Sequence, residues 1–291
     1  MLTGVREQLG RALFRRVAGP GGPETRARIH HTPGPRWFGP DRPIRAVHGD
    51  ASMFIGGLTA LLLQSLHPLA MAAVAGHSGY RGDPWGRLQR TSTFLAVTTY
   101  GTAEDARQAV DHVRGIHERI RGTTPEGERY HAADPHLLAW VHAAETDSFL
   151  RAHERYGARP LDAAGYDAYV ADTARVAAAL GAEDPPRDRR ELAERLAAYR
   201  PELRATPEAR AAARFLLFQP PLPLAARPFY GGLAANAVTL LPPWARGMLW
   251  LPRVPVVESL AVRPTGQALT RTIRWAMAPG REASGLPPQR A

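Results

Sequence analysis

Apolar and polar residues follow a helical pattern along most of the chain. From Asp50 onward helical signals follow one another, and apolar side chains recur at spacings of three and four in the clearest segments. No segment of useful length alternates apolar and polar residues as a half-buried strand does, and no internal repeat is present. The pattern therefore predicts one all-α domain of eight to eleven helices.

Capping residues, glycines and prolines mark the expected ends of these helices. We expect helices to begin at Asp50, Asp83, Thr102, Asp134, Asp162, Arg187 and Thr206. Three of them should end before the glycines Gly101, Gly122 and Gly157. Residues 219–256 are dense in proline, which predicts short helices joined by tight turns. A last helix is expected from about Thr265 to Ala278.

The domain organisation follows from the same signals. Residues 1–49 read as a short helix followed by an extended arm, because residues 17–45 are rich in Pro, Gly and Arg. Residues 50–280 form the predicted all-α domain, and residues 281–291 are predicted to be a disordered tail.

One stretch, from Ala51 to Ala75, is long and uncharged enough to cross a membrane. Pro68 breaks it near the middle, and a residue before proline is pushed out of helical dihedrals. Two buried helices that meet at the break are therefore expected, without stable membrane insertion. Residues 1–16 carry four arginines and do not resemble a secretory signal, so a soluble cytoplasmic protein is expected.

The composition excludes several chemistries. All 37 basic residues are arginine, and the chain has neither lysine nor cysteine. Schiff-base chemistry, thiolate nucleophiles, iron–sulfur clusters and cysteine-bound metals are therefore excluded. The net charge is +10, but the arginines are scattered rather than clustered in one stripe, so no nucleic-acid partner is expected. Any metal or haem must be bound by His, Met, Tyr or carboxylate.

The helix after Thr102 presents an apolar stripe with a histidine on it. The apolar positions are Ala106, Ala109, Val110, Val113, Ile116 and Ile120. His117 lies four residues after Val113 and three before Ile120, so it points into this stripe. The pattern allows either a satisfied core histidine or a metal or haem ligand in an apolar shell.

The helix from Pro84 to Tyr100 begins with two arginines. Leu88, Thr91, Leu95 and Thr98 are expected to form its inner stripe. Arg87 and Arg90 lie at its head, and buried guanidinium groups need anionic partners. These partners are either ordinary carboxylates or a bound anion or polarised oxygen species.

A third group of candidates lies on the helix from Pro135. Leu138, His142, Glu145 and Phe149 share one face, so His142 and Glu145 could bind iron without haem. In the preceding loop Glu128 and His131 form a Glu-x-x-His pair, but a di-iron centre needs two such motifs on helices. The di-iron pattern is incomplete.

At these residues the chain resembles the rubber oxygenase / MpaB-type oxygenase family, over roughly residues 50–255. The matching stretches are Leu63-Gln64, His67-Pro68, His77-Ser78, Asp83-Pro84, Gly86-Arg87, Arg90-Thr91, Tyr100-Gly101-Thr102, Val113-Arg114-Gly115-Ile116-His117, Tyr130, Asp134-Pro135, Trp140-Val141-His142 and Leu241-Pro242-Pro243. Their order and spacing together carry the resemblance.

The resemblance implies a globin-like helical core that holds haem b. It implies His117 as the axial ligand of the iron, with Arg87, Arg90 and Thr91 as a distal or propionate-facing wall that can stabilise bound oxygen. His142 is a further candidate cofactor-binding residue. The reaction implied is oxygen insertion into an apolar small molecule, such as an isoprenoid or polyketide, with cleavage of a carbon–carbon double bond as one form.

The chain departs from the latex-clearing branch of that family at two points. That branch has lysine at the position of Arg90, and a guanidinium will not bind iron as a deprotonated lysine can. It also uses an upstream glutamate, whereas Ala51 to Gly82 contains no acidic residue. Two alternatives stay open: a non-haem iron oxygenase using His142 and Glu145, and a non-enzymatic module whose Arg-rich surface binds a polyanion or membrane.

Overall fold

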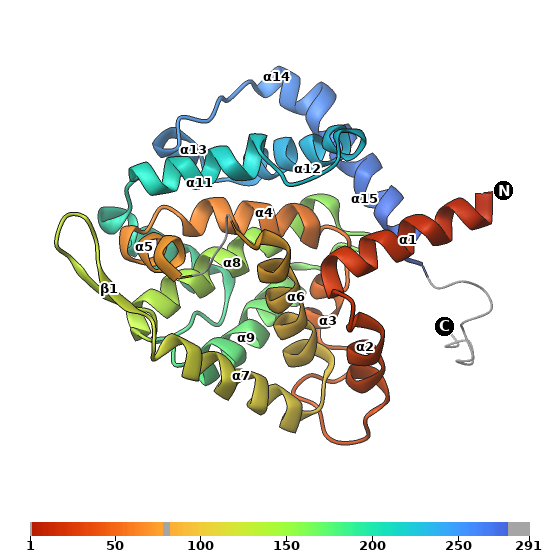
Figure 1. Ribbon diagram of the computed structural model, residues 1–291, viewed down its shortest axis with the longest axis horizontal. Helices are drawn as coiled ribbons and strands as arrows, with labels where there is room; N and C mark the ends of the chain where they lie inside the picture. The colour runs from red at the N-terminus through yellow and green to blue at the C-terminus, as the bar shows by residue number, and fades with distance from the viewer. Residues whose placement is uncertain (1, 78–81, 279–291) are drawn as a thin grey trace.

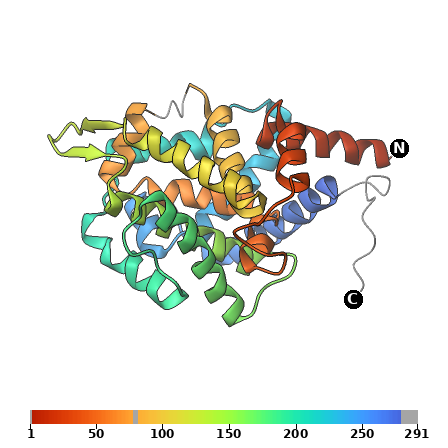
Figure 2. The same cartoon turned by 90° about the horizontal axis from the view of Figure 1, so that it is seen from below.

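The computed structural model describes residues 2–77 and 82–278 and is almost entirely helical (Figure 1). Within that part of the chain the sheet content is one antiparallel hairpin, β1 (Arg121–Thr123) paired with β2 (Arg129–His131). The predicted all-α fold is confirmed. Figure 2 shows the hairpin projecting at one end of the molecule and the first helix at the other.

Helices follow one another from the N-terminus. The first nine are α1 (Leu2–Ala18), α2 (Gly22–His31), α3 (Pro43–His48), α4 (Met53–Gln64), α5 (Pro68–His77), α6 (Pro84–Tyr100), α7 (Ala103–His117), α8 (Pro135–Tyr156) and α9 (Ala163–Leu180). The later elements are α10 (Arg189–Ala198), η1 (Arg200–Glu202), α11 (Pro207–Phe218), η2 (Leu224–Ala226), α12 (Arg227–Leu240), α13 (Pro243–Met248), α14 (Pro255–Val257), the π-helical turn η3 (Glu258–Val262) and α15 (Arg263–Met277).

The packing of α4 against α8 forms the centre of the molecule. α4 carries no charge and buries most of its length, with Ile55, Leu62 and Leu63 fully inside. Gly56 permits the close approach, because a Cβ there would lie 2.8 Å from the ring of Phe149 on α8. The apolar sequence of α4 is thus explained by burial on several sides.

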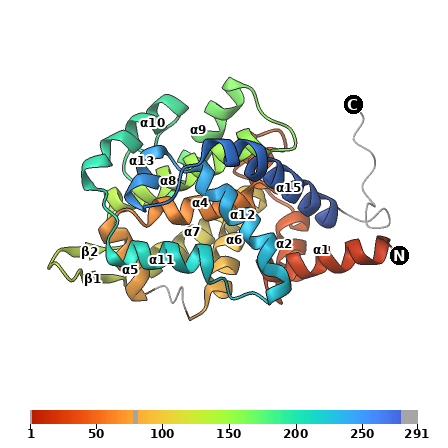
Figure 3. The ribbon, with the colours of Figure 1, turned by 90° about the horizontal axis from the view of Figure 1, so that it is seen from above.

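Two layers enclose this central pair. Helices α11–α14 cover it from above in Figure 1 and face the viewer in Figure 3, whereas α3, α6, α7 and α9 lie below. α1 and α15 lie side by side at the end opposite the hairpin. The cavity described below lies on the lower side, where α3, α6 and α9 meet α8.

The expected helix starts are confirmed wherever a side chain caps the backbone locally. Asp83, Thr102, Asp134, Asp162 and Thr206 each accept a hydrogen bond from a backbone N–H two or three residues on. The start expected at Arg187 lies one residue early, because Asp188 caps α10. Gly101 and Gly157 end their helices as expected.

Several expectations are wrong. The arm expected over residues 17–45 contains α2 and the start of α3, because Pro23 and Pro43 sit in the first turn, where proline is tolerated. Asp50 does not cap α4; its carboxylate binds the backbone N–H of Ser52 and the guanidinium of Arg274. α7 does end before Gly122, but already at His117, so Ile120 of the expected stripe lies beyond the helix.

The region expected to hold only short helices, residues 219–256, includes the 14-residue α12. The described residues also contain more helices than the eight to eleven expected, because short ones such as α2 and α3 were not recognised. The tail expected to be disordered, residues 281–291, lies outside the described residues.

The uncharged stretch around Pro68 forms two helices, as expected. α4 and α5 meet at an angle of 109°. Among the described residues no single helix has the length and apolarity needed to cross a bilayer, although this bent pair passes the same test by length and composition. α4 lies between α8 and α12 in the protein interior.

Candidate functional site

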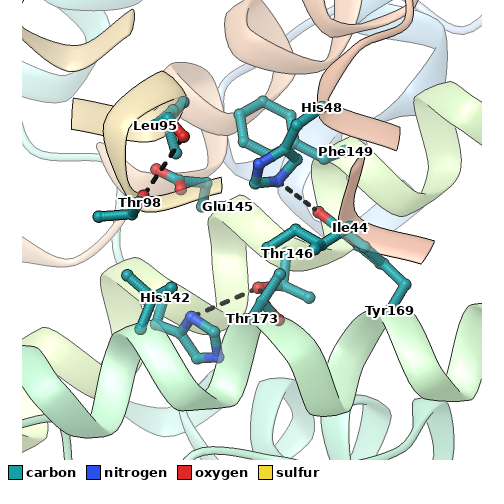
Figure 4. A pocket seen from close by; sticks show the side chains of 11 residues that line it. Ile44, His48, Leu95, Thr98, His142, Glu145, Thr146, Phe149, Tyr169 and Thr173 are labelled. Carbon is teal, nitrogen blue, oxygen red and sulfur yellow. Dashed lines mark hydrogen bonds between the residues drawn. The ribbon is translucent and has the colours of Figure 1, made fainter. Parts of the chain in front are cut away.

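A small polar cavity lies where α3, α6, α8 and α9 meet (Figure 4). Its lining consists of Ile44, His48, Leu95, Thr98, His142, Glu145, Thr146, Phe149, Tyr169, Thr173 and Val176. The volume is about 30 Å³, room for one or two water molecules. Two of the candidates from the sequence, His142 and Glu145, therefore share one cavity wall.

The cavity receives His48 because α3 is anchored on α9. The buried carboxylate of Asp172 accepts hydrogen bonds from the guanidinium of Arg42, one of them at 2.9 Å from Nε, and from the backbone N–H of Ile44 at 3.3 Å. At the other end of α3, Nδ1 of His48 lies 2.9 Å from the hydroxyl of Thr99. Nε2 of His48 lies 3.4 Å from the hydroxyl of Tyr169.

Both histidines of the cavity are neutral at physiological pH. Burial lowers the pKa of His48 to about 3 and that of His142 to about 4, since the imidazolium form loses its hydration there. Nδ1 of His142 lies 3.4 Å from the hydroxyl of Thr146, whereas its Nε2 is buried with no hydrogen-bond partner. A neutral imidazole with an unpaired nitrogen can accept a proton or bind a metal.

Glu145 has the opposite shift, for the same reason. Burial raises its pKa to about 7, and a hydrogen bond with the side chain of Gln64 offsets part of that shift. Burial, with the nearby charges of Glu145 and Asp172, also raises the pKa of the Tyr169 phenol. The cavity thus contains a carboxyl group that changes its protonation state near neutral pH, beside two imidazoles that do not.

Replacing Glu145 by Gln is expected to change how stability depends on pH. Because the folded-state pKa is raised from 4.5 to about 7, the protonated carboxyl contributes stability below pH 4.5 that is lost as pH rises through 7. Glu145→Gln should escape that loss, which amounts to about 3 kcal/mol at most. The lowered pKa values of His48 and His142 make stability fall as pH falls below 6.5. This effect is the same in both proteins.

Urea unfolding of both proteins at about pH 5 and about pH 8 measures the difference. The wild type should lose stability relative to Glu145→Gln between these two values. The exposed Glu126→Gln is the matched control and should parallel the wild type. Parallel curves for Glu145→Gln and the wild type would show that Glu145 titrates in the folded protein as it does in water.

The face of α6 that lines the cavity extends beyond it. Leu95 and Thr98 lie in the cavity wall, and Thr91 and Leu88 follow on the same face one and two turns earlier. Thr91 is exposed and Leu88 is 38% exposed, so the expected inner stripe is covered only at its C-terminal half. The uncovered half leaves a surface that leads away from the cavity.

The two arginines at the head of α6 differ in environment. Arg90 is exposed and pairs with the exposed Asp83 at 3.3 Å, which is ordinary pairing with a carboxylate. Arg87 is half-buried one turn before Thr91. The expectation of a buried helix head is therefore wrong for Arg90.

His117 lies at the last position of α7, outside the cavity lining. The stripe it belongs to is buried at Ala106 and Val110 and half-buried at Val113 and Ile116. Nδ1 of His117 is buried with no hydrogen-bond partner. Burial, with the neighbouring His131, lowers its pKa, so the imidazole is neutral.

Other candidate ligands do not complete a metal centre with these residues. Glu128 pairs with Arg204 at the exposed hairpin, and His131 lies near Glu118. Among the described residues, three ligand groups come within 4.8 Å of one another at His67, His136 and Glu202. There the carboxylate of Glu202 accepts hydrogen bonds from both imidazoles, at 3.3 and 3.0 Å, which links η1 to the starts of α5 and α8.

His48 and Tyr169 were not predicted from the sequence. His48 is the last residue of the short helix α3, next to the segment expected to be extended. Tyr169 lies on the alanine-rich helix α9. Only the anchoring of α3 by Asp172 brings the two side chains together. A histidine at the end of a short Pro-initiated helix is the one signal the sequence offered.

Comparison with known proteins assigns the chain to a family. Residues 45–275 match the family described as ER-bound oxygenase mpaB/B′/rubber oxygenase, catalytic domain. The chain belongs to this oxygenase family. The matched region contains α6, His117 and the whole cavity lining except Ile44.

Two relatives are uncharacterized proteins, one from Mycobacterium tuberculosis and one from Mycobacterium bovis. Each is 37% identical over 98 residues, which cover 33% of this chain and 38% of the relative. The chain therefore matches well under two thirds of the length of these relatives. No solved structure is significantly similar.

Proposed function

We propose that this protein is a haem-b-dependent oxygenase in which His117 is the axial ligand. The observation that carries the proposal is the buried, unpartnered Nδ1 of a neutral imidazole on the apolar stripe of α7. A neutral imidazole in an apolar shell is what haem iron binds in many proteins. Membership of an oxygenase family supports the same reading.

The residues present include a nitrogen donor for haem iron, but the small cavity excludes one position for the porphyrin. His117 supplies the donor, because no described group competes for its buried nitrogen. The cavity of about 30 Å³ cannot contain a porphyrin, and His117 is not in its lining. The uncovered face of α6 at Leu88 and Thr91 is the surface on which the proposal places the macrocycle.

Haem b, when bound, supplies the redox chemistry that activates O2. Arg87 and Arg90 at the head of α6 are the cations that we propose for a haem propionate; Arg87 is half-buried, and Arg90 is exposed and pairs with Asp83. In this proposal the hydroxyl of Thr91 on the uncovered face of α6 is a hydrogen-bond donor for a bound ligand. His142 and Glu145 in the adjoining cavity hold and transfer protons.

The substrate that we propose is an apolar small molecule of the isoprenoid or polyketide kind. Leu88 on the uncovered face and Leu95 and Phe149 in the cavity offer it apolar contacts. Oxygen insertion with cleavage of a carbon–carbon double bond is the reaction proposed.

Titration of the purified full-length protein with haemin, followed by its visible spectrum, tests the axial ligand. The wild type should bind one equivalent of haem with a Soret band of a histidine-ligated species. His117→Ala should lose this band and retain its helical circular dichroism. His112→Ala, an exposed histidine five residues earlier on α7, is the matched control and should bind haem like the wild type.

Two results would overturn the assignment. If His117→Ala and His112→Ala both keep the wild-type spectrum, another residue binds the haem iron and the assignment of His117 is wrong. If the wild type binds iron without a Soret band and His142→Ala loses that iron, the protein is a non-haem oxygenase centred on the cavity.

A further inference from the structure

Much of the net positive charge lies in the C-terminal layer, α11 to η3, and in the adjoining α15. Residues 207–278, which form these elements, contain eight arginines and two glutamates and carry +6 of the net charge of +10. Residues 1–206 contain 27 arginines and 24 acidic residues and carry +3. The arginines are scattered along the sequence, but acidic residues are scarce from α11 onward.

One of the two glutamates of this layer does not reach the surface. Glu258 is 9% exposed, and its carboxylate pairs with the buried Arg246 at 2.7 Å. Arg214, Arg227 and Arg253 are exposed. The other glutamate, Glu208 in the first turn of α11, is half-buried, so the exposed side chains of the layer include more guanidinium groups than carboxylates.

The same layer exposes large apolar side chains. Phe218, Leu224, Trp250, Val256 and Leu260 are 74%, 76%, 78%, 66% and 76% exposed, respectively. They come from the end of α11, from η2, from the turn after α13, from α14 and from η3, which belong to the upper side in Figure 1. Most of the strongly exposed large apolar side chains of the described chain belong to this one layer.

The fold holds Trp250 in its exposed position. Its φ of +56° lies in the left-handed region, where a helix C-terminus ordinarily has glycine. Arg246 fixes this turn, because its carbonyl accepts the N–H of Leu251 at 2.9 Å and its guanidinium binds the carbonyl of Pro252. Arg210 of α11 stacks on the indole at 4.5 Å. An unfavourable conformation thus presents the indole to solvent beside a cation.

We propose that this layer, α11 to η3, binds the surface of an anionic membrane. Interfacial surfaces combine arginines for lipid phosphates with Trp, Phe and Leu that enter the acyl boundary. A second copy of the chain is a poor occupant, because a twofold contact through this layer would place arginines against arginines. Such binding is peripheral and is separate from the haem proposal.

Co-sedimentation of the full-length protein with vesicles tests the proposal. The protein should bind vesicles of phosphatidylcholine and phosphatidylglycerol in equal parts and bind pure phosphatidylcholine at least tenfold more weakly. Raising the salt concentration should weaken binding to the anionic vesicles, because the arginine–phosphate attraction is screened.

Variants test whether vesicle binding depends on this layer or on the overall charge of the chain. The double variant Arg214→Gln, Arg253→Gln should weaken vesicle binding more than tenfold, at about fivefold for each arginine. Trp250→Ser, Leu260→Ser should also weaken it with the arginines retained. Arg107→Gln, Arg114→Gln, two exposed arginines on α7 in the opposite layer, is the matched control and should bind like the wild type.

Three outcomes would overturn the proposal. One is equal binding to both kinds of vesicle. Another is an equal loss in the α7 control. The third is a dimer in lipid-free solution that Trp250→Ser, Leu260→Ser dissociates, which would assign the layer to self-association. Circular dichroism of each variant establishes that it is folded, and haem binding by the same variants should be unchanged.

Discussion

Replacing Glu258 by Ala is expected to lower the free energy of unfolding by about 3–5 kcal/mol, because it leaves a buried guanidinium without its counter-charge. Arg246 is 5% exposed and donates to both oxygens of Glu258, at 2.7 and 3.3 Å. The guanidinium holds the pKa of Glu258 below its ordinary value, so this stability is lost as pH falls below 4.5. Chemical denaturation at neutral pH measures the effect.

The same substitution should loosen the turn that presents Trp250. Glu258 also accepts the backbone N–H of Val254, and Arg246 holds the carbonyl of Pro252, so the pair closes the segment between them. Arg246→Leu, Glu258→Leu should lose less stability than Glu258→Ala alone, because it removes both charges. Glu7→Gln breaks an exposed pair with Arg11 and should leave stability unchanged. A loss for Glu258→Ala no larger than for Glu7→Gln would contradict the expectation.

Trp140→Ala is expected to destabilise the protein by about 3–5 kcal/mol, the range for removing a buried tryptophan. Trp140 is fully buried on α8, and its indole N–H donates to the carbonyl of Gln64 at 3.2 Å. The side chain of Gln64 returns a hydrogen bond to the carbonyl of Val141 at 3.2 Å. The substitution therefore opens a cavity and breaks one of the hydrogen bonds between α4 and α8.

Two variants separate these contributions in the same unfolding measurement. Trp140→Phe keeps one buried aromatic ring and loses the hydrogen bond and the rest of the indole, so it should cost about 1–3 kcal/mol, less than Trp140→Ala. Trp275→Ala, at a tryptophan that is 43% exposed on α15, should cost much less than Trp140→Ala. Equal losses for Trp140→Ala and Trp275→Ala would show that burial of Trp140 does not hold α4 on α8.

The fold class and most helix ends could be predicted from the sequence, because their causes are local. Asp83, Thr102 and Asp134 cap helices through contacts with residues only two or three positions away. The break at Pro68 likewise depends on dihedral restrictions of neighbouring residues. The side of α7 that carries His117 also follows from spacing alone, since helical periodicity places residues on faces.

Contacts between distant segments decided the rest. Asp50 has the residue type of a cap, but Arg274, far along the chain, takes its carboxylate. His48 reaches the cavity because Asp172 anchors α3, and α2 forms in a segment rich in Pro and Gly. Helical periodicity does not show which half of α6 is buried, because burial depends on the other helices that pack against it.

The surface around Trp250 is the clearest case. Its sequence reads as a proline-rich connection between short helices. The tertiary structure removes Glu258 from the surface by burying it against Arg246 and turns Trp250 outward beside Arg210. Composition determined that the chain is basic and rich in arginine. Only packing decided that one of the two carboxylates of this layer is hidden from solvent, because burial selects which charges solvent meets.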